Sequence, residues 1–249
     1  GNAADNIWVV GDSGTGDDNQ KAVYSAYQNY VKRAGQRPID FYLHVGDMAY
    51  PKGTDDEFQR KFFDIYQPTL RQTTCWASMG NHEGHTSKGL SGIGPYYDAY
   101  VCPTRGQCGG LPSATEAFYS FDYANVHFIC LDSHDLDRSP DAAMAQWLRA
   151  DLEKANTLLS KKAAEYPITI GTADVYYQGD PTKWRKLANS LALRFYMRIS
   201  AKKPDVAKAG IEKIVGNATQ YPIITAIADD CAMPFAGNSN DDSWPANAI

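Results

Sequence analysis

The sequence predicts an α/β fold for its first part and a mainly α-helical fold for the rest. Three largely apolar runs, residues 7–10, 39–45 and 74–79, each end in a glycine followed by a polar residue, and helical patterns separate them. Such runs are typical of buried strands, and strands that alternate with helices are typical of a parallel sheet. The later sequence shows helical periodicity without this alternation. We therefore divide the chain into residues 1–155 and 156–249.

Periodicity and turn residues predict the other elements of the first part. They are helices at about residues 19–32 and 55–70, a long loop at 84–116, a hairpin of strands 118–123 and 126–132 with a turn at Ala124-Asn125, and a helix that opens at Ser139-Pro140-Asp141. The loop is rich in glycine, proline, serine and tyrosine, and loops of this length are usually functional or mobile. The last helix has a capping residue followed by proline at its first position.

The second part is dominated by one amphipathic helix, from Lys183 to Ser200. Asp180 is its predicted N-cap and Pro181 its first residue. Its apolar residues fall on one face at helical spacing: Trp184, Leu187, Ala188, Leu191 and Phe195. A second helix is predicted at about residues 205–215, and the tail from Asp229 has the composition of a loop.

The composition is that of a soluble globular protein. Of the 249 residues, 43% are hydrophobic and 21% are charged, and the formal net charge is −5. The negative charge argues against a general nucleic-acid binder, but it leaves phosphorylated small molecules open because bound cations can dominate a local field. The sequence contains no run of about 18 apolar residues, so we expect no membrane span. No signal peptide is visible; Gly1 in place of methionine suggests a processed or recombinant start, so an export signal could have been removed.

The five cysteines suggest one disulfide at most. Cys102 and Cys108 lie close together in the long loop and could pair, whereas Cys130 and Cys75 adjoin apolar runs and are expected to be buried free thiols. An odd count with one plausible pair gives weak support for an oxidising compartment.

Polar side chains follow the predicted strands at the points where the strands end. Asp12, Asp47 and Asn81 each follow a glycine at the end of an apolar run. The carboxyl ends of parallel strands share one edge of a sheet, where ligands bind in open α/β folds. Carboxylate and amide oxygens suit hard cations, and a bridging carboxylate can hold two metals, as in two-metal phosphatases. Singly, each aspartate has the simpler reading of a turn former; the ordered set of three motifs indicates a metal site.

The ordered motifs Gly-Asp-Ser-Gly, Gly-Asp-Met-Ala-Tyr and Gly-Asn-His-Glu resemble the calcineurin-like metallophosphoesterases, and most closely the purple acid phosphatase branch, over about residues 6–155. The resemblance implies a half sandwich of the metallophosphoesterase type. It implies that Asp12 and Tyr50 bind a first metal, that Asp47 bridges both metals and that Asn81 binds the second. His82 would stabilise or protonate the reacting ester. The implied cofactors are two metal ions (Fe, Mn or Zn), and the implied reaction is attack of a metal-activated hydroxide on a phosphate ester.

The histidines depart from that family's pattern. The family adds three imidazole ligands downstream, but this chain has histidines only at positions 44, 82, 85, 127 and 134. His44 and His127 lie in apolar strands and are expected in the core. His85 and His134 lie in loops near the site and are the candidate substitute ligands. We therefore expect an incomplete dinuclear site, and no residue is assigned to an organic cofactor.

The second part resembles a different family, the SusD/RagB glycan-capturing outer-membrane lipoproteins. The resemblance rests on residues 174–180, 183–194 and 197–200, and it continues at Asp229-Asp230 and at Ser243-Trp244-Pro245. It implies a glycan or an outer-membrane transporter as partner, and a periplasmic, outer-membrane-associated or secreted location. The stretch is scaffold in that family. Its aromatic residues Tyr176, Tyr177 and Trp184 could stack on sugars or lie in the core.

The chain therefore reads as composite, with a join near residues 148–158. Three hypotheses follow. The first is an enzyme, a metal-dependent phosphoesterase of the acid phosphatase type; the second is a glycan-binding scaffold without catalytic activity. The third is a chain that performs neither function, because two half-folds would leave apolar faces uncovered.

Overall fold

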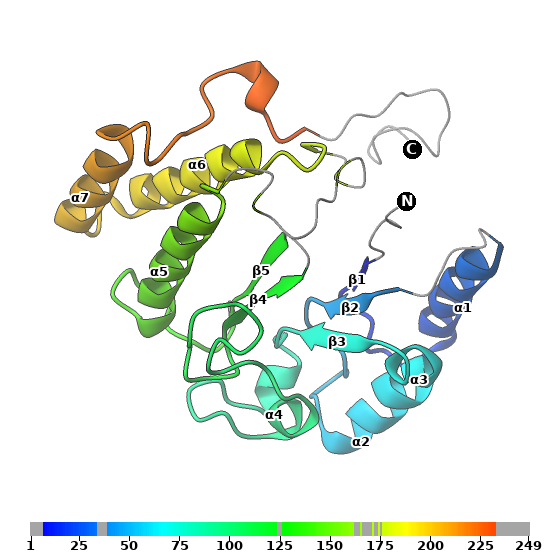
Figure 1. The fold of residues 1–249 in the computed structure, drawn as a ribbon. Coiled ribbons are helices and arrows are strands. Elements are labelled where there is room, and N and C mark those ends of the chain that lie inside the picture. Colours follow the sequence, from blue (N-terminus) through cyan, green and yellow to red (C-terminus); the bar gives the residue numbers. More distant parts are fainter. Residues whose placement is uncertain are drawn as a thin grey trace. The chain divides into compact units, whose positions relative to one another are not determined.

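The computed structural model describes residues 7–33, 39–123, 126–161, 165, 171, 174 and 176–232. The chain divides into two compact units, with the boundary between Asp151 and Leu152. This boundary lies inside helix α5 (Ala143–Leu158), which Figure 1 labels with the other elements. The assignment of 1–155 and 156–249 to separate domains stays a prediction.

Unit 1 contains a three-stranded parallel sheet. Strands β1 (Ile7–Val10), β2 (Phe41–His44) and β3 (Thr74–Ala77) lie in the order β1-β2-β3. The register pairs Ile7 with Phe41 and Phe41 with Thr74, so all three strands run in one direction and end at one edge. The three parallel strands expected from the apolar runs are therefore present, whereas the metallophosphoesterase half sandwich stays a prediction.

Helices cover one face of this sheet. α1 (Asp18–Arg33) follows β1. A helical segment follows β2 and consists of α2 (Asp55–Phe58), the π-helical turn η1 (Gln59–Phe63) and α3 (Asp64–Leu70). The single helix expected over 55–70 thus has three parts. Trp8 stacks on Tyr27 of α1 at 3.9 Å between ring centroids, and Tyr42 lies 5.8 Å from Tyr66 of α3. Aromatic packing therefore fixes these helices on the sheet.

A hairpin covers part of the other face. Strands β4 (Tyr119–Tyr123) and β5 (Val126–Cys130) pair antiparallel, as predicted, and the expected turn at 124–125 lies outside the described residues. Phe121 stacks on Trp76 at 3.8 Å and meets Phe41 edge-on at 5.8 Å. The expectation that β1 is buried on both faces was wrong. Val9 is 56% exposed, because β1 is an edge strand and the hairpin packs on β2 and β3.

The long loop is more structured than expected. It contains a 3-10 turn, η2 (Glu83–His85), and a short helix, α4 (Pro95–Ala99). The disulfide that Cys102 and Cys108 could have formed is absent, and all five cysteines are free thiols. The thiol of Cys102 is buried against Tyr119, whereas the backbone carbonyl of Cys108 accepts a hydrogen bond from Asp122 on β4. The two cysteines therefore contact different neighbours.

His127 on β5 is not a simple core histidine, so that expectation was wrong. Its Nδ1 lies 2.5 Å from Asp122 Oδ1 and its Nε2 lies 2.7 Å from Asp151 Oδ2, and Asp151 is fully buried. Burial lowers the pKa of His127, but the hydrogen bonds to Asp151 and Asp122 outweigh it and raise that pKa overall. His44, by contrast, is fully buried as expected, and burial lowers its pKa to about 3.

Unit 2 is helical. It contains the end of α5, α6 (Pro181–Ile199), α7 (Pro204–Val215) and the 3-10 turn η5 (Ile227–Asp229). The predicted N-cap is confirmed, because the Asp180 side chain accepts a hydrogen bond from Thr182 N–H. Figure 1 shows α6 and α7 side by side, and a Cβ at Gly210 of α7 would lie 2.3 Å from Tyr196 Cε1 of α6. Glycine is needed there for the close approach of the two helices.

Two buried polar groups organise unit 2. The Asn189 amide of α6 donates to Asn156 Oδ1 of α5 at 3.0 Å and to the Pro222 carbonyl at 2.9 Å. Asp174 accepts the backbone N–H of Tyr177 at 3.1 Å and the indole N–H of Trp184 at 2.6 Å. These contacts fix the turn that precedes α6 as a scaffold element. Residues 243–245 lie outside the described residues.

Candidate functional site

The predicted site residues of β1 and β2 come together at the carboxyl edge of the sheet. Asp12 N–H donates to the Gly46 carbonyl at 3.1 Å, and Gly14 N–H donates to the Asp47 carbonyl at 3.1 Å. Asp12 and Asp47 both adopt left-handed conformations, with φ of 53° and 59°. Few non-glycine residues adopt this conformation, and aspartate and asparagine are the ones that do so at low cost. The turn that carries Asp12 is therefore joined to the turn that carries Asp47 by backbone hydrogen bonds.

Tyr50 joins the two carboxylates. Its hydroxyl donates to Asp12 Oδ1 at 3.1 Å and lies 3.5 Å from Asp47 Oδ2. Burial, then the hydrogen bond to Asp12 and the charges of both aspartates, raise the pKa of Tyr50 above its ordinary value of 10.0. The phenol is accordingly neutral near pH 7 and serves as a proton donor between two acids. Two carboxylates and a phenol oxygen are donor types that suit one hard cation.

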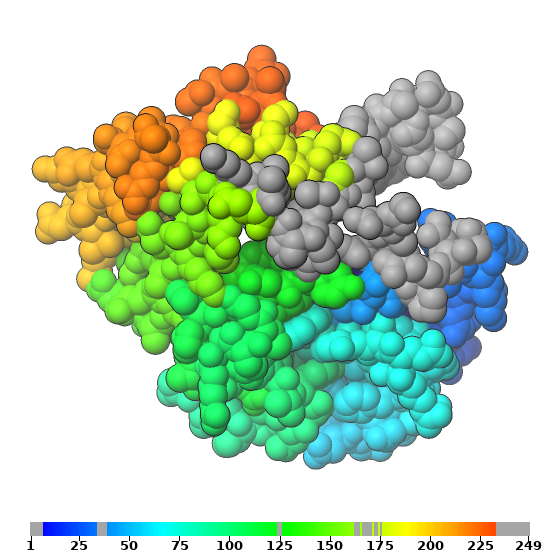
Figure 2. Space-filling model, in the orientation of Figure 1, coloured from blue at the N-terminus to red at the C-terminus, as the bar shows by residue number. Residues whose placement is uncertain are grey.

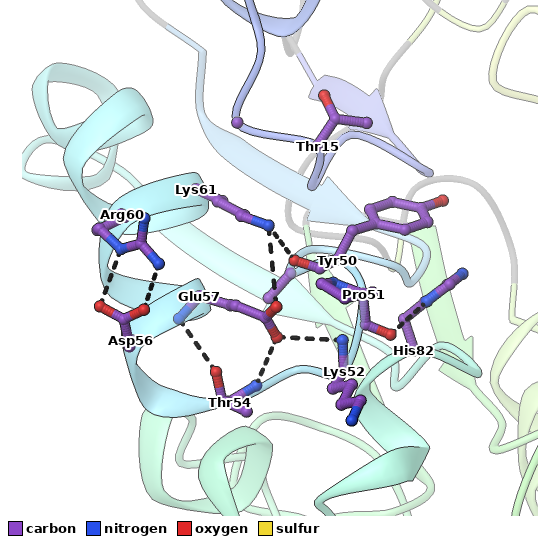
Figure 3. Close-up of polar contacts among 12 residues, drawn as sticks. Thr15, Tyr50, Pro51, Lys52, Thr54, Asp56, Glu57, Arg60, Lys61 and His82 are labelled. Carbon is purple, nitrogen blue, oxygen red and sulfur yellow. Dashed lines mark hydrogen bonds and ion pairs between the residues drawn. The ribbon is translucent and has the colours of Figure 1, made fainter.

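His82 lies against the same group. Its backbone N–H donates to Asp47 Oδ1 at 3.1 Å, and its ring centroid is 4.0 Å from that of Tyr50. Its Nδ1–H donates to the Pro51 carbonyl at 2.8 Å, as Figure 3 shows. A carbonyl oxygen can only accept, so this contact places a proton on Nδ1 and leaves Nε2 as the ring nitrogen that does not contact Pro51.

Glu83, a buried carboxylate that the sequence analysis did not single out, holds the backbone of the site. Glu83 is fully buried and accepts backbone N–H groups of Asp47 at 2.9 Å, Gly80 at 2.9 Å and Ala49 at 3.0 Å. Burial raises its pKa, against the lowering effect of these N–H groups. A Cβ at Gly80 would lie 2.2 Å from Asp47 Oδ1, so only glycine fits there. Glu83 completes the Gly-Asn-His-Glu motif, and that position was the available signal.

The segment that carries Tyr50 is held by a second layer of polar contacts. Figure 3 shows Glu57 Oε2 accepting the Lys52 N–H, at 3.1 Å, and Lys61 reaching the Tyr50 carbonyl. Glu57 also forms a capping box with Thr54 at the start of α2. These contacts hold the backbone of residues 50–52. That backbone positions the Tyr50 phenol and the Pro51 carbonyl, which accepts from His82.

The other predicted site residues are not joined to this group. Asn81 is exposed between Gly80 and His82, and His85 is exposed with its ring 6.2 Å from that of His82. His134 is exposed and lies against Gly84. Within the described ranges, no three His, Cys, Asp or Glu side chains are grouped to hold a metal ion. The described donors that lie together are thus Asp12, Asp47 and Tyr50, and the two metals that the resemblance implies stay a prediction.

The aromatic residues of unit 2 separate into two kinds. Tyr177 is buried, and its ring meets Trp184 edge-on at 5.1 Å between centroids. Both belong to the packing around Asp174. Tyr176 is 42% exposed and is the most exposed of the three. Nowhere in the described part of the chain is a helix long and apolar enough to cross a membrane.

Comparison with known proteins bears on the carboxyl-terminal part. Residues 142–248 match the model of the family SusD-like_2, described as "Starch-binding associating with outer membrane". Neither a curated protein nor a solved structure matches the chain. The resemblance of residues 6–155 to metallophosphoesterases stays a prediction. Residues 142–248 are thus the part of this chain with a family match, and that family is SusD-like.

Proposed function

We propose that residues 142–248 act as a glycan-binding scaffold at the outer membrane. The family match over these residues carries the proposal, since the description of that family names starch binding and the outer membrane. An outer-membrane transporter is the second partner that the resemblance implies. This function places the protein in the periplasm or at the outer membrane, and it requires no catalysis.

Tyr176 is the residue we assign to sugar contact. It is exposed, and it stands on a turn that Asp174 fixes through hydrogen bonds to the backbone N–H groups of Tyr176 and Tyr177. A rigid exposed aromatic ring offers a flat apolar face at a low entropic cost of ordering. Tyr177 is buried and contributes to the scaffold instead.

Calorimetric titration of the full chain with a linear malto-oligosaccharide tests this proposal. We expect binding that Tyr176→Ala weakens by about tenfold, the equivalent of about 1.4 kcal/mol. Tyr221→Phe is the control, because that ring is buried and its hydroxyl contacts Glu153. Absence of binding to malto-oligosaccharides and to other soluble glucans, in a chain with a cooperative melting transition, would sink the proposal.

A second candidate function is phosphate-ester hydrolysis in unit 1. The meeting of Asp12, Asp47, Tyr50 and His82 at the sheet edge favours it. A bound hard cation would supply Lewis acidity and lower the pKa of a water molecule. The two carboxylates and the phenol would hold that cation. His82 would hold the proton for the leaving alcohol at Nε2, with its tautomer set by Pro51.

Metal titration tests this second function separately. With Fe(III), a Tyr50 ligand would give a visible tyrosinate absorption, and Tyr50→Phe would abolish it. Asp47→Asn would weaken binding of Mn(II) or Zn(II) without changing the side chain's shape. Asp18→Asn is the control, because Asp18 is exposed on α1. If the wild-type chain binds none of these metals, or if Asp47→Asn binds them equally well, residues 12–82 are not a metal centre.

A further inference from the structure

The carboxyl-terminal part of the apolar stripe of α6 lies at the surface of unit 2. Leu191 and Phe195, one helical turn apart, are 36% and 46% exposed. The helix packs through its other side, where Asn189 is buried and the Tyr196 ring meets Gly210 of α7. The yellow atoms of α6 reach the surface in Figure 2. Among the described residues, Leu191 and Phe195 are therefore the part of the stripe that other elements cover least.

The same side of the helix is basic. Residues 191, 194, 195 and 198 share one side of α6 at about 3.6 residues per turn. Lys202 lies in the turn that follows the helix, and all five residues are exposed. The set comprises Leu191, Arg194, Phe195, Arg198 and Lys202, which we call the basic apolar face. Helix α6 contains no acidic residue, although the whole chain has a net charge of −5.

The charges at the start of α6 are already engaged, which sets the basic apolar face apart. Arg185 donates to Asn156 Oδ1 at 2.9 Å, Lys186 pairs with Asp229 at 2.7 Å and Lys183 donates to the Ala228 carbonyl at 2.9 Å. Within the described ranges, Arg194 and Arg198 form no ion pair. Two unpaired guanidinium groups that flank an exposed phenyl ring form a surface suited to an anionic partner.

We propose that the basic apolar face binds an anionic lipid surface. Aromatic and aliphatic side chains bordered by arginine and lysine are characteristic of helices that lie at a membrane interface. The long arginine and lysine stems can cover apolar surface while their charges reach phosphate groups. A second copy of the chain is disfavoured, because two such faces would oppose like charges. The inference rests on the proposed association of residues 142–248 with the outer membrane.

Co-sedimentation of the full chain with lipid vesicles tests this surface. We expect binding to phosphatidylcholine vesicles with about 30% phosphatidylglycerol, weak binding to pure phosphatidylcholine and release as salt rises from about 0.1 to about 0.5 M. Each cation contributes about fivefold to binding, so Arg194→Gln/Arg198→Gln should bind about 25-fold more weakly. Phe195→Ser should also weaken binding, which charge attraction alone does not predict.

Lys208→Gln is the matched control. Lys208 is exposed on α7 and lies beside Glu212, so its loss should leave vesicle binding within about twofold. Equal binding to neutral and anionic vesicles, or equal binding by the double variant, would overturn the proposal. An acidic polypeptide that binds the face while anionic vesicles do not would also overturn it. Loss of malto-oligosaccharide binding with vesicle binding kept would refute only the glycan function, and the converse only the lipid surface.

Discussion

Replacement of Glu83 by glutamine should destabilise unit 1 more than the same exchange at Glu116. The Glu83 carboxylate accepts backbone N–H groups from Asp47, Ala49 and Gly80, and so ties the turn after β2 to the turn after β3. Glutamine has the same shape and keeps one oxygen. It can hold two of the three donors, and its NH2 group then faces the third.

The magnitude follows from these contacts. A buried N–H without a partner costs about 1–3 kcal/mol, and hydrogen bonds to a charged acceptor contribute about 1.5–3 kcal/mol against about 1 kcal/mol for neutral ones. Removal of a buried charge offsets part of the loss, because burial already disfavours the ionised form. We expect Glu83→Gln to lower the free energy of unfolding by about 2–4 kcal/mol. Glu116→Gln, whose carboxylate accepts one N–H from Cys102, should lower it by about 1 kcal/mol.

Urea unfolding followed by tryptophan fluorescence measures both values, and the two variants should share the wild-type m-value. If Glu83→Gln costs no more than Glu116→Gln, the three N–H contacts do not hold the two turns, and the account of the site's scaffold is wrong.

Three further outcomes are expected. The pKa of His127 is raised in the folded chain, so the stabilisation by its protonated form is complete below about pH 6.5 and is lost as the pH rises through the folded pKa. Urea midpoints measured from about pH 5.5 to 8.5 should therefore fall less steeply with pH for His127→Gln than for wild type. Asn189→Ala should cost about 2–3 kcal/mol because it removes a buried amide together with its hydrogen bonds to Asn156 Oδ1 and the Pro222 carbonyl. This would show as a lower melting temperature of unit 2, and a loss below about 0.5 kcal/mol would contradict it. Gly80→Ala should displace the Asp47 carboxylate, so metal titration should show weaker binding than for wild type, and equal binding would refute this account of the glycine.

The parallel sheet and the meeting of Asp12, Asp47 and Tyr50 could be predicted from the sequence. Apolar runs that end in glycine and aspartate define where strands stop, and parallel strands bring those ends to one edge. The motif Gly-Asn-His-Glu drew attention to the position of Glu83 but not to its supporting role, because the backbone N–H groups of Asp47 and Ala49 that it accepts are 36 and 34 residues away in sequence. The role of His127 was hidden for a similar reason, since Asp151 lies 24 residues further along the chain.

Helical periodicity correctly placed Leu191 and Phe195 on one face of α6. It does not indicate whether a neighbouring element covers that face. The exposed side of β1 was missed for the same reason. The suggested disulfide is absent because the closeness of Cys102 and Cys108 in sequence does not fix the direction of their side chains.

The left-handed backbone at Asp12 and Asp47 restricts which amino acids these two positions can accept. Glycine, asparagine and aspartate adopt that conformation at low cost, whereas glutamate and alanine are strained there. A library randomised at both positions and selected only for folding should return those three residues. Selection for cation binding as well should return aspartate alone. The difference between the two sets separates what the turn requires of the chain from what a ligand requires.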